Sequence, residues 1–311
     1  MLKIGFFGTP HLAKQILKDL FENEKFQIKF VVTGPDKPIG RGLEMKSSAV
    51  KEFASKNGIK IFQPEKIRKN VEFLETIKNI ECDYYIAVAY GKILPEELLS
   101  FPKKMPINVH FSILPKYRGS SPIQSCLING DPETGVTIMK MSAGMDEGDI
   151  IDILKIKTDK FETSDSLFDK FANISGKFMI ETIEKYENGL LKLIPQDNEK
   201  ATYCQKIEKE NGLANFNQSA EILFNLWKGL TSWPGIYSFF NSKKIIFEEC
   251  DFSLENANGK IGEVIKIGEK IGIKCEKGVL ILKKVKIEGK KGQEIKNFIN
   301  GYRDIIGYKF N

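Results

Sequence analysis

The chain has 311 residues, of which 41% are hydrophobic and 28% charged, a composition typical of a soluble globular protein long enough for two domains. No apolar run approaches the roughly 20 residues that cross a bilayer, and the five cysteines are scattered without a CxxC pair, which argues against a disulfide framework or a cysteine zinc site. We therefore expect a cytoplasmic protein that binds neither a metal nor a membrane.

The net charge of +6 is concentrated near the C-terminus. Eleven lysines and five glutamates lie between Lys260 and Lys296, and this excess of +6 equals that of the whole chain. A basic segment beside a neutral remainder favours a polyanionic partner, with nucleic acid first, although a solvated lysine surface explains the charge equally well. Four of the 47 basic residues are arginines, and each is a mild indication that a planar fork of donors is needed: Arg41, Arg68, Arg118 and Arg303.

The first half of the chain alternates short apolar runs with amphipathic stretches. The apolar runs predict strands at 2–7, 27–33, 59–62, 83–89, 107–109 and 135–141. An irregular loop, GPDKPIGRGLEMKSS, follows the second run, and a helix over about 164–187 closes the series. This rhythm predicts an α/β domain over 1–188, Rossmann-like, with an open, mostly parallel sheet between two layers of helices. Such sheets bind ligands beyond the C-terminal ends of their strands.

The rest of the chain has a different pattern. Residues 189–208 are predicted to form a linker. A domain over 209–311 then begins with a short helix at 219–229 and continues with five glycine-punctuated alternating runs at 236–241, 244–250, 262–268, 270–275 and 278–287. Five short strands at hairpin spacing predict a small antiparallel β-barrel of the OB-like type.

The stretch NVHFSILPKYRG (108–119) contains His110, one of only two histidines. Asn108 and His110 are two positions apart in a predicted strand, so they point to the same face at its C-terminal end. Taken alone, a turn-closing asparagine and a histidine with satisfied hydrogen bonds are the commoner interpretation. Asp146, flanked by glycines in SAGMDEGDII, forms an acidic turn or approaches His110 and fixes its tautomer and charge.

Several enzyme classes do not fit the sequence. It contains no complete GxGxxG or GxxxxGK[ST] motif, which argues against dinucleotide-binding and P-loop proteins. Two histidines without a ligand cluster argue against a zinc enzyme. The lack of a GxSxG motif argues against a serine hydrolase.

Two segments together resemble the formyltransferase family that uses 10-formyltetrahydrofolate: NVHFSILPKYRGSSPIQ (108–124) and GVTIMKMSAGMDEGDI (135–150). The resemblance implies that Asn108, His110 and Asp146 surround the formyl carbon. On this interpretation, Asn108 and His110 donate hydrogen bonds to the oxyanion of the reaction, about 3–4 kcal/mol for each donor. Asp146 keeps His110 competent as a donor and helps to relay the proton of the attacking amine.

The resemblance also implies a binding site for the folate. The folate loop consists of Ser112, Ile113, Leu114 and Pro115. Ile113 stands where the family usually has leucine, which is a near-isosteric change. VAYGKILP (88–95) is similar to the wall of the family's pterin pocket, which implies that Tyr90 and Gly91 are neighbours of the ligand.

Four further segments resemble the branch of this family that formylates methionyl-tRNA: FFGTP (6–10), GPDKPIGRG (34–42), SWPGIYSFF (232–240) and GQEIKNFINGYRDIIG (292–307). This resemblance implies transfer of the formyl group from 10-formyltetrahydrofolate to the α-amino group of methionyl-initiator tRNA, a step of translation initiation, by an enzyme expected to be a monomer. It implies that the loop after the second strand enters the acceptor end of the tRNA, with Lys37 and Arg41 as contacts.

Two alternatives belong to other classes of protein. An amino-sugar nucleotide N-formyltransferase shares the catalytic core but has no use for a basic C-terminal barrel. A non-enzymatic RNA-binding module uses the barrel but has no use for Asn108, His110 and Asp146 together.

Overall fold

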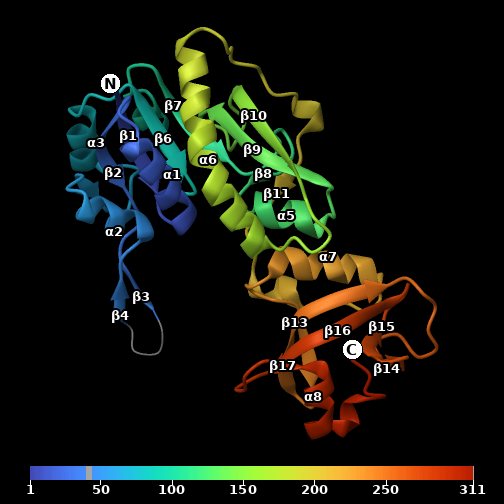
Figure 1. The fold of residues 1–311 in the computed structure, drawn as a ribbon. Helices are drawn as coiled ribbons and strands as arrows, with labels where there is room; N and C mark the ends of the chain where they lie inside the picture. The colour runs from blue at the N-terminus through green and yellow to red at the C-terminus, as the bar shows by residue number, and fades with distance from the viewer. Residues whose placement is uncertain (40–43, 311) are drawn as a thin grey trace. The chain divides into compact units, whose positions relative to one another are not determined.

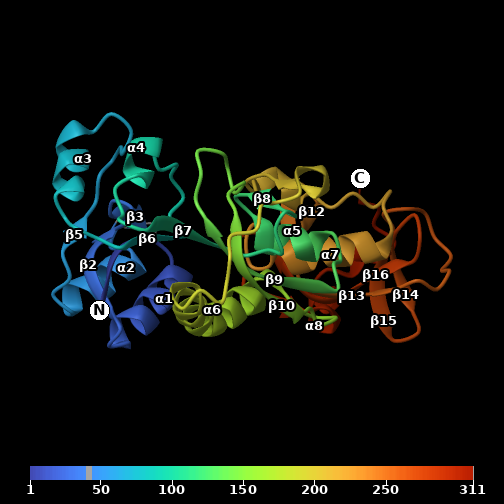
Figure 2. The same ribbon diagram turned by 90° about the horizontal axis from the view of Figure 1, so that it is seen from above.

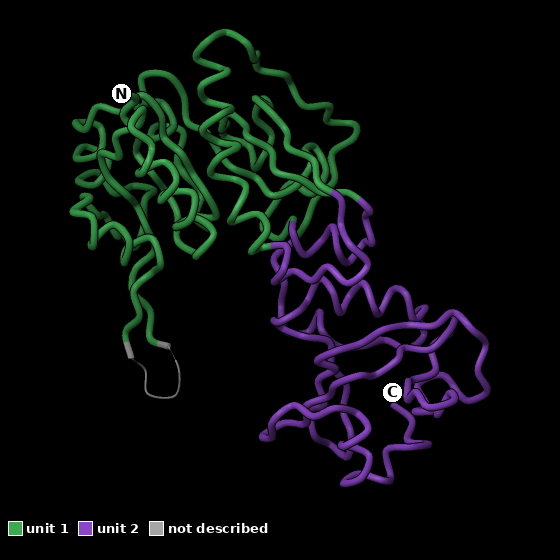
Figure 3. The backbone as a smooth tube through the Cα atoms, viewed as in Figure 1, with its two compact units in different colours: residues 1–122, 133–156, 168–204 green, residues 123–132, 157–167, 205–311 purple. Residues whose placement is uncertain are grey.

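The computed structural model describes residues 1–39 and 44–310. The chain divides into two compact units, and it passes between them more than once (Figure 3). Unit 1 consists of Met1–Pro122, Glu133–Ile156 and Phe168–Cys204. Unit 2 consists of Ile123–Pro132, Lys157–Leu167 and Gln205–Asn311. Within the described ranges, no helix has the length and apolar character that a membrane span requires.

Unit 1 is built on a seven-stranded sheet in the order β10-β9-β7-β6-β1-β2-β5 (Figure 1). The strands are β1 (Leu2–Gly8), β2 (Phe26–Val32), β5 (Ile61–Phe62), β6 (Tyr84–Val88), β7 (Met105–His110), β9 (Glu133–Lys140) and β10 (Ile150–Lys157). The pairings from β7 through β6, β1 and β2 to β5 are parallel, whereas β9 pairs with β7 antiparallel. The prediction of an open, mostly parallel, Rossmann-like sheet is confirmed.

Helices cover both faces of this sheet. They are α1 (His11–Glu22), α2 (Ala49–Lys56), α3 (Val71–Lys78), α4 (Glu96–Leu99) and α6 (Ser164–Glu187). Figure 2 shows α3 and α4 on one face and α1 and α6 on the other. Neighbouring residues of a strand point to opposite faces, yet Phe6 and Phe7 of β1 are both fully buried because each face is covered.

The loop predicted to be irregular after β2 is partly regular. β3 (Lys37–Ile39) and β4 (Glu44–Lys46) form an antiparallel hairpin, in which Lys37 pairs with Lys46 (Figure 1). Arms of three residues are too short to show a periodic pattern, so the sequence did not predict them. Arg41 lies outside the described residues.

Unit 2 contains a curled antiparallel sheet in the order β12-β13-β16-β15-β14, with β17 beside β16. The strands are β12 (Tyr237–Phe240), β13 (Lys243–Ser253), β14 (Val264–Ile267), β15 (Lys270–Lys274), β16 (Val279–Ile287) and β17 (Gln293–Glu294). The register between β13 and β16 shifts between Phe247 and Cys250, and such a bulge bends the strand that carries it. The helices are α5 (Pro122–Ile128), which begins at the end of a unit 1 segment, α7 (Ala220–Leu230) and α8 (Ile295–Gly301). The prediction of a small, barrel-like antiparallel domain is confirmed.

The stretch 189–208, expected to be a linker, contains two short elements. η1 (Asn198–Lys200) is a single 3-10 turn. β11 (Tyr203–Cys204) pairs in parallel with β8 (Arg118–Gly119), next to the predicted folate loop. Of this stretch, residues 189–204 belong to unit 1 and residues 205–208 to unit 2.

Candidate active site

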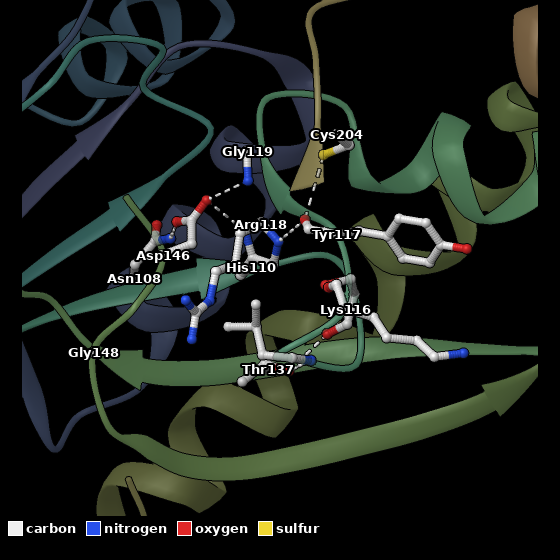
Figure 4. Close-up of polar contacts among 12 residues, drawn as sticks. Asn108, His110, Lys116, Tyr117, Arg118, Gly119, Thr137, Asp146, Gly148 and Cys204 are labelled. Atoms are coloured by element: carbon white, nitrogen blue, oxygen red, sulfur yellow. Dashed lines mark hydrogen bonds and ion pairs between the residues drawn. The ribbon is translucent and has the colours of Figure 1, made fainter. Parts of the chain in front are cut away.

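Asn108 and His110 lie at the C-terminal end of β7, between strands β6 and β9. Asn108 is in register with Ala87 of β6, and His110 with Thr137 of β9. His110 is 5% exposed, whereas Asn108 is partly exposed. The two side chains point the same way, as their spacing predicted, and both reach Asp146 (Figure 4).

Asp146 joins this pair from the loop between β9 and β10. Its Oδ1 accepts a hydrogen bond from Nδ2 of Asn108 (3.2 Å), and its Oδ2 accepts one from the backbone N–H of Gly119 (2.9 Å). Oδ2 also lies 3.5 Å from Nδ1 of His110. The backbone of Asp146 has φ +55°, a left-handed conformation that is uncommon for a residue with a side chain. The structure thus brings the three predicted catalytic residues together.

The second ring nitrogen of His110 has a backbone partner. Nε2 lies 2.9 Å from the carbonyl oxygen of Tyr117. A carbonyl only accepts hydrogen bonds, so this contact assigns the proton to Nε2 and leaves Nδ1 as the nitrogen that gains or loses a proton. A lone pair on Nδ1 would face the Asp146 carboxylate, so this contact is favourable only when one of the two groups carries a proton. His110 was expected to donate to an oxyanion, but here both of its nitrogens face protein oxygens.

The predicted folate loop is held by a threonine, Thr137, that is not one of the predicted site residues. Oγ1 of Thr137 donates to the carbonyl of Ser112 (2.6 Å) and accepts from the N–H of Leu114 (3.2 Å). The Ser112 hydroxyl donates to the carbonyl of Lys116 (2.6 Å), and the peptide bond between Leu114 and Pro115 is cis. Thr137 is fully buried on β9 (Figure 4), and its only signal in the sequence is one polar residue inside the apolar run GVTIM.

Tyr90 and Gly91 follow β6 at the same end of the sheet. The Tyr90 ring packs against Phe7, with ring centroids 6.0 Å apart. Its hydroxyl is buried and has no hydrogen-bond partner among the described residues, and burial raises its pKa to about 12. Gly91 is exposed and has φ +77°. Tyr90 therefore has a free buried donor.

Arg118 is a structural anchor and is only 1% exposed. Its Nε and Nη2 donate to Oε1 of Gln196 at 3.1 and 2.9 Å, and Nη2 also donates to Oδ1 of Asn198 at 2.8 Å. Nη1 lies 3.7 Å from Oε1 of Glu147, the neighbour of Asp146. Gln196 and Asn198 follow Arg118 by 78 and 80 residues, so no local pattern could identify them.

Lys37, one of two residues expected to contact tRNA, is exposed on β3. Lys92 is close enough that the positive charge of Lys37 contributes, after burial, to lowering the Lys92 pKa. Nζ of Lys92 donates to the carbonyls of Pro64 (2.8 Å) and Glu65 (2.7 Å). Two positive charges therefore lie near the β3–β4 hairpin.

Comparisons with known proteins agree with these features. The family described as "Formyl transferase" matches residues 2–183, and "Formyl transferase, C-terminal domain" matches residues 206–303. The chain is 40% identical to a methionyl-tRNA formyltransferase of Sulfurihydrogenibium sp. (strain YO3AOP1), over 99% of this chain and 100% of that protein. It is 39% identical to a methionyl-tRNA formyltransferase of Caldicellulosiruptor saccharolyticus, over 97% of each chain.

Among solved structures, the chain is similar to WlaRD, a sugar 3N-formyl transferase. The TM-score is 0.66 at 23% identity, covering 94% of this chain and 99% of that one, and this likeness concerns the fold alone. The sequence matches to methionyl-tRNA formyltransferases show the family as well as the fold, because they extend over both units at higher identity. The chain belongs to the formyl transferase family, and within it to the methionyl-tRNA formyltransferases.

Proposed function

We propose that this chain transfers the formyl group of 10-formyltetrahydrofolate to the α-amino group of methionyl-initiator tRNA, which gives N-formylmethionyl-tRNA for translation initiation. The observation that carries the proposal is the meeting of Asn108, His110 and Asp146 at the end of β7, in a chain similar to methionyl-tRNA formyltransferases over its full length. We expect the enzyme to act as a monomer in the cytoplasm.

The proposed chemistry begins with attack of the free amine on the formyl carbon, which forms a C–N bond and an oxyanion. Nδ2 of Asn108 gives one hydrogen to Asp146 and keeps the second for the oxyanion, a contribution of about 3–4 kcal/mol. Nε2 of His110 faces the Tyr117 carbonyl instead of the oxyanion, so His110 has another role in the reaction. Its Nδ1 and the Asp146 carboxylate together accept the proton that the amine loses, and they return it to N10 of the folate as the old C–N bond breaks.

The folate is proposed to bind between the loop Ser112–Ile113–Leu114–Pro115 and the segment with Tyr90 and Gly91. The buried hydroxyl of Tyr90, without a partner among the described residues, supports a polar ligand atom nearby. The hydrogen bonds of Thr137 hold the loop in one conformation, so that its backbone is ready for a planar ligand.

The tRNA is proposed to contact two parts of the chain. The lysine-rich segment from Lys260 to Lys296 follows the phosphate backbone, and the β3–β4 hairpin, with Lys37 and Arg41, enters the acceptor end. The exposed position of Lys37 near Lys92 supports this arrangement, because a phosphate would relieve the repulsion between the two charges.

Two acceptors offered in parallel test the proposal. The protein is incubated with 10-formyltetrahydrofolate and either methionyl-initiator tRNA or an amino-sugar nucleotide, and formylated product is measured. We expect product only from the charged tRNA, and none from uncharged tRNA, which lacks the amine. Formylation of the amino sugar alone would replace the proposal with the sugar enzyme, and no product with either acceptor would contradict both.

A further inference from the structure

Residues 194–204, here called the strap, run along the backbone that follows the proposed folate loop. Ile194 exchanges two backbone hydrogen bonds with Ile150, at 2.8 and 2.9 Å. The N–H of Thr202 donates to the carbonyl of Pro115 (3.2 Å), and its own carbonyl accepts from the N–H of Arg118 (2.8 Å). The strap is therefore hydrogen-bonded to the proposed folate loop at Pro115 and to the first residue of β10, the strand that follows the Asp146 loop.

The strap also sets the direction of the Gly119 N–H. The neighbouring N–H groups, of Arg118 and Ser120, donate to the carbonyls of Thr202 and Cys204, so the intervening Gly119 N–H points the other way, to Oδ2 of Asp146. Only glycine fits this position, since an added Cβ would lie 2.2 Å from the Cys204 carbonyl oxygen and the backbone has φ +124°.

The side chain of Gln196, a residue of the strap, connects the strap to the Asp146 loop. Its Nε2 donates to the carbonyl oxygens of Asp146 (2.8 Å) and Gly148 (2.7 Å). Its Oε1 accepts two hydrogen bonds from Arg118. Because Arg118 only donates, the orientation of the amide is fixed, and both of its hydrogens are committed to the loop.

A non-glycine residue in a left-handed conformation persists only where its surroundings hold it. Asn108 and Gly119 hold the carboxylate of Asp146, whereas the hydrogen bond to its carbonyl oxygen among the described residues comes from Gln196. Asn198 offers a comparison, since its side chain accepts from Arg118 and has no hydrogen bond to the Asp146 loop among the described residues.

We infer that Gln196 is a positioning residue for formyl transfer: it fixes the backbone of the Asp146 loop, and through it the carboxylate that faces His110 and Asn108. The inference rests on the proposed role of Asp146 in the reaction. It assigns to the segment between the two matched family regions a part in organising the active site.

Three variants separate the contribution of the Nε2 donors of Gln196 from that of its Oε1 acceptor. Gln196→Met removes both, Gln196→Glu keeps the acceptor for Arg118 but loses both donors, and Asn198→Ala removes an acceptor of Arg118 alone. We expect kcat to fall about tenfold in both Gln196 variants, with KM for folate and tRNA changed less than about twofold, because a small misplacement of a reacting group slows the chemical step. The kcat of Asn198→Ala should stay within about twofold of that of the unchanged enzyme, because the Asn198 side chain makes no hydrogen bond to the Asp146 loop among the described residues.

A double-mutant cycle with Asp146→Ala distinguishes positioning from general stabilisation. In single-turnover measurements, Gln196→Met should cost less than about twofold once Asp146 is absent, because the group that it positions is gone. A merely structural residue would cost the same factor in both backgrounds. Thermal unfolding confirms that each variant is folded, and if Gln196→Met does not fold, Gln196→Glu takes its place in the cycle.

The inference would be overturned by full kcat in a folded Gln196 variant, by additive losses in the cycle, or by an equal loss in Asn198→Ala. Near-normal turnover of Asp146→Ala would overturn the proposed role of Asp146 and this inference with it. An inactive Asp146→Ala beside a fully active Gln196→Glu would overturn this inference alone.

Discussion

Nε2 of His110 lies 2.9 Å from the carbonyl oxygen of Tyr117, while Nδ1 of the same ring faces Oδ2 of Asp146 at 3.5 Å. The first contact fixes the tautomer, because a carbonyl needs a donor. The second places a carboxylate beside the only ring nitrogen that can change its protonation. This geometry favours an acid–base role for His110, and it leaves Asn108 as the side chain with a spare donor.

The first prediction concerns Asn108, His110 and Asp146. His110→Gln keeps an amide donor that can reach the Tyr117 carbonyl but has no group that accepts a proton, so it should be about as inactive as His110→Ala. We expect each of these variants, and also Asn108→Ala and Asp146→Ala, to lower the rate of formyl transfer by about 10²-fold or more in single-turnover assays. A folded His110→Gln enzyme with near-normal turnover would show that the contact with Tyr117 is the whole role of His110.

The position of Asn108 and His110 on one face of β7 was predictable from sequence, because it depends on a local rule. Side chains alternate along a strand, so the spacing of two positions sets their common face. The partners of Arg118 were not predictable, since Gln196 follows it by 78 residues, and the two-residue strands that align them show no period. Packing in three dimensions decides such contacts, and single-sequence patterns do not record them.

Thr137 gives the second prediction, with Thr134 on the same strand as its matched control. Thr137→Val leaves the buried N–H of Leu114 and the carbonyl of Ser112 without this partner, which should cost about 1–3 kcal/mol of stability. If the loop binds folate, KM for 10-formyltetrahydrofolate should rise as well. The Thr134 hydroxyl is buried and has no hydrogen-bond partner among the described residues, so Thr134→Val should be neutral or stabilising.

Urea denaturation of both threonine variants, with folate binding measured alongside, checks this prediction. Equal losses of stability in the two variants would mean that any change of side chain on β9 is harmful. In that case the hydrogen bonds of Thr137 would have no special part in holding the loop.

Asp36, at the root of the β3–β4 hairpin, gives a prediction about pH. Hydrogen bonds from Lys51 (2.6 Å) and then Gln63 (2.9 Å) hold the pKa of the Asp36 carboxyl below its ordinary value of 3.8. A carboxyl with a pKa lowered by folding stabilises the folded state above its unfolded pKa, and this contribution disappears as the pH falls through the folded value. Asp36→Asn should therefore be less stable than the unchanged protein at neutral pH, and the two should converge as the pH falls through the lowered pKa of the Asp36 carboxyl.

Denaturation curves at several pH values measure this convergence. Lys51→Met, which removes the main partner of Asp36 and leaves Gln63 in place, should lose the larger share of this pH-dependent stability. A difference between Asp36→Asn and the unchanged protein that stays constant at all pH values would assign the effect to packing instead of charge.

The last prediction concerns the lysine-rich segment of unit 2 and is tested by changing single side chains instead of truncating the chain. Deleting the chain after residue 204 would remove α7, which packs closely on the earlier part of unit 2: a Cβ on Gly229 would lie 2.5 Å from Ile128. Such a truncation would disturb the fold, so single charges should be removed instead. The lysines of β16 lie near acidic neighbours, with Lys283 and Lys284 within 3.8 Å of a carboxylate oxygen.

Lys266, Lys270 and Lys291 are the better choice, because they are exposed and form no ion pair within the described ranges of the chain. If each neutralises one phosphate, replacing all three with glutamine should reduce the slope of log affinity against log salt by about 2–3. The matched control removes the same number of charges from exposed lysines elsewhere: Lys56, Lys66 and Lys192. Filter binding of methionyl-tRNA between low and moderate salt measures both sets. A slope reduced equally by both sets would mean that net charge alone attracts the tRNA, and an unchanged slope in the first set would place its phosphate contacts elsewhere.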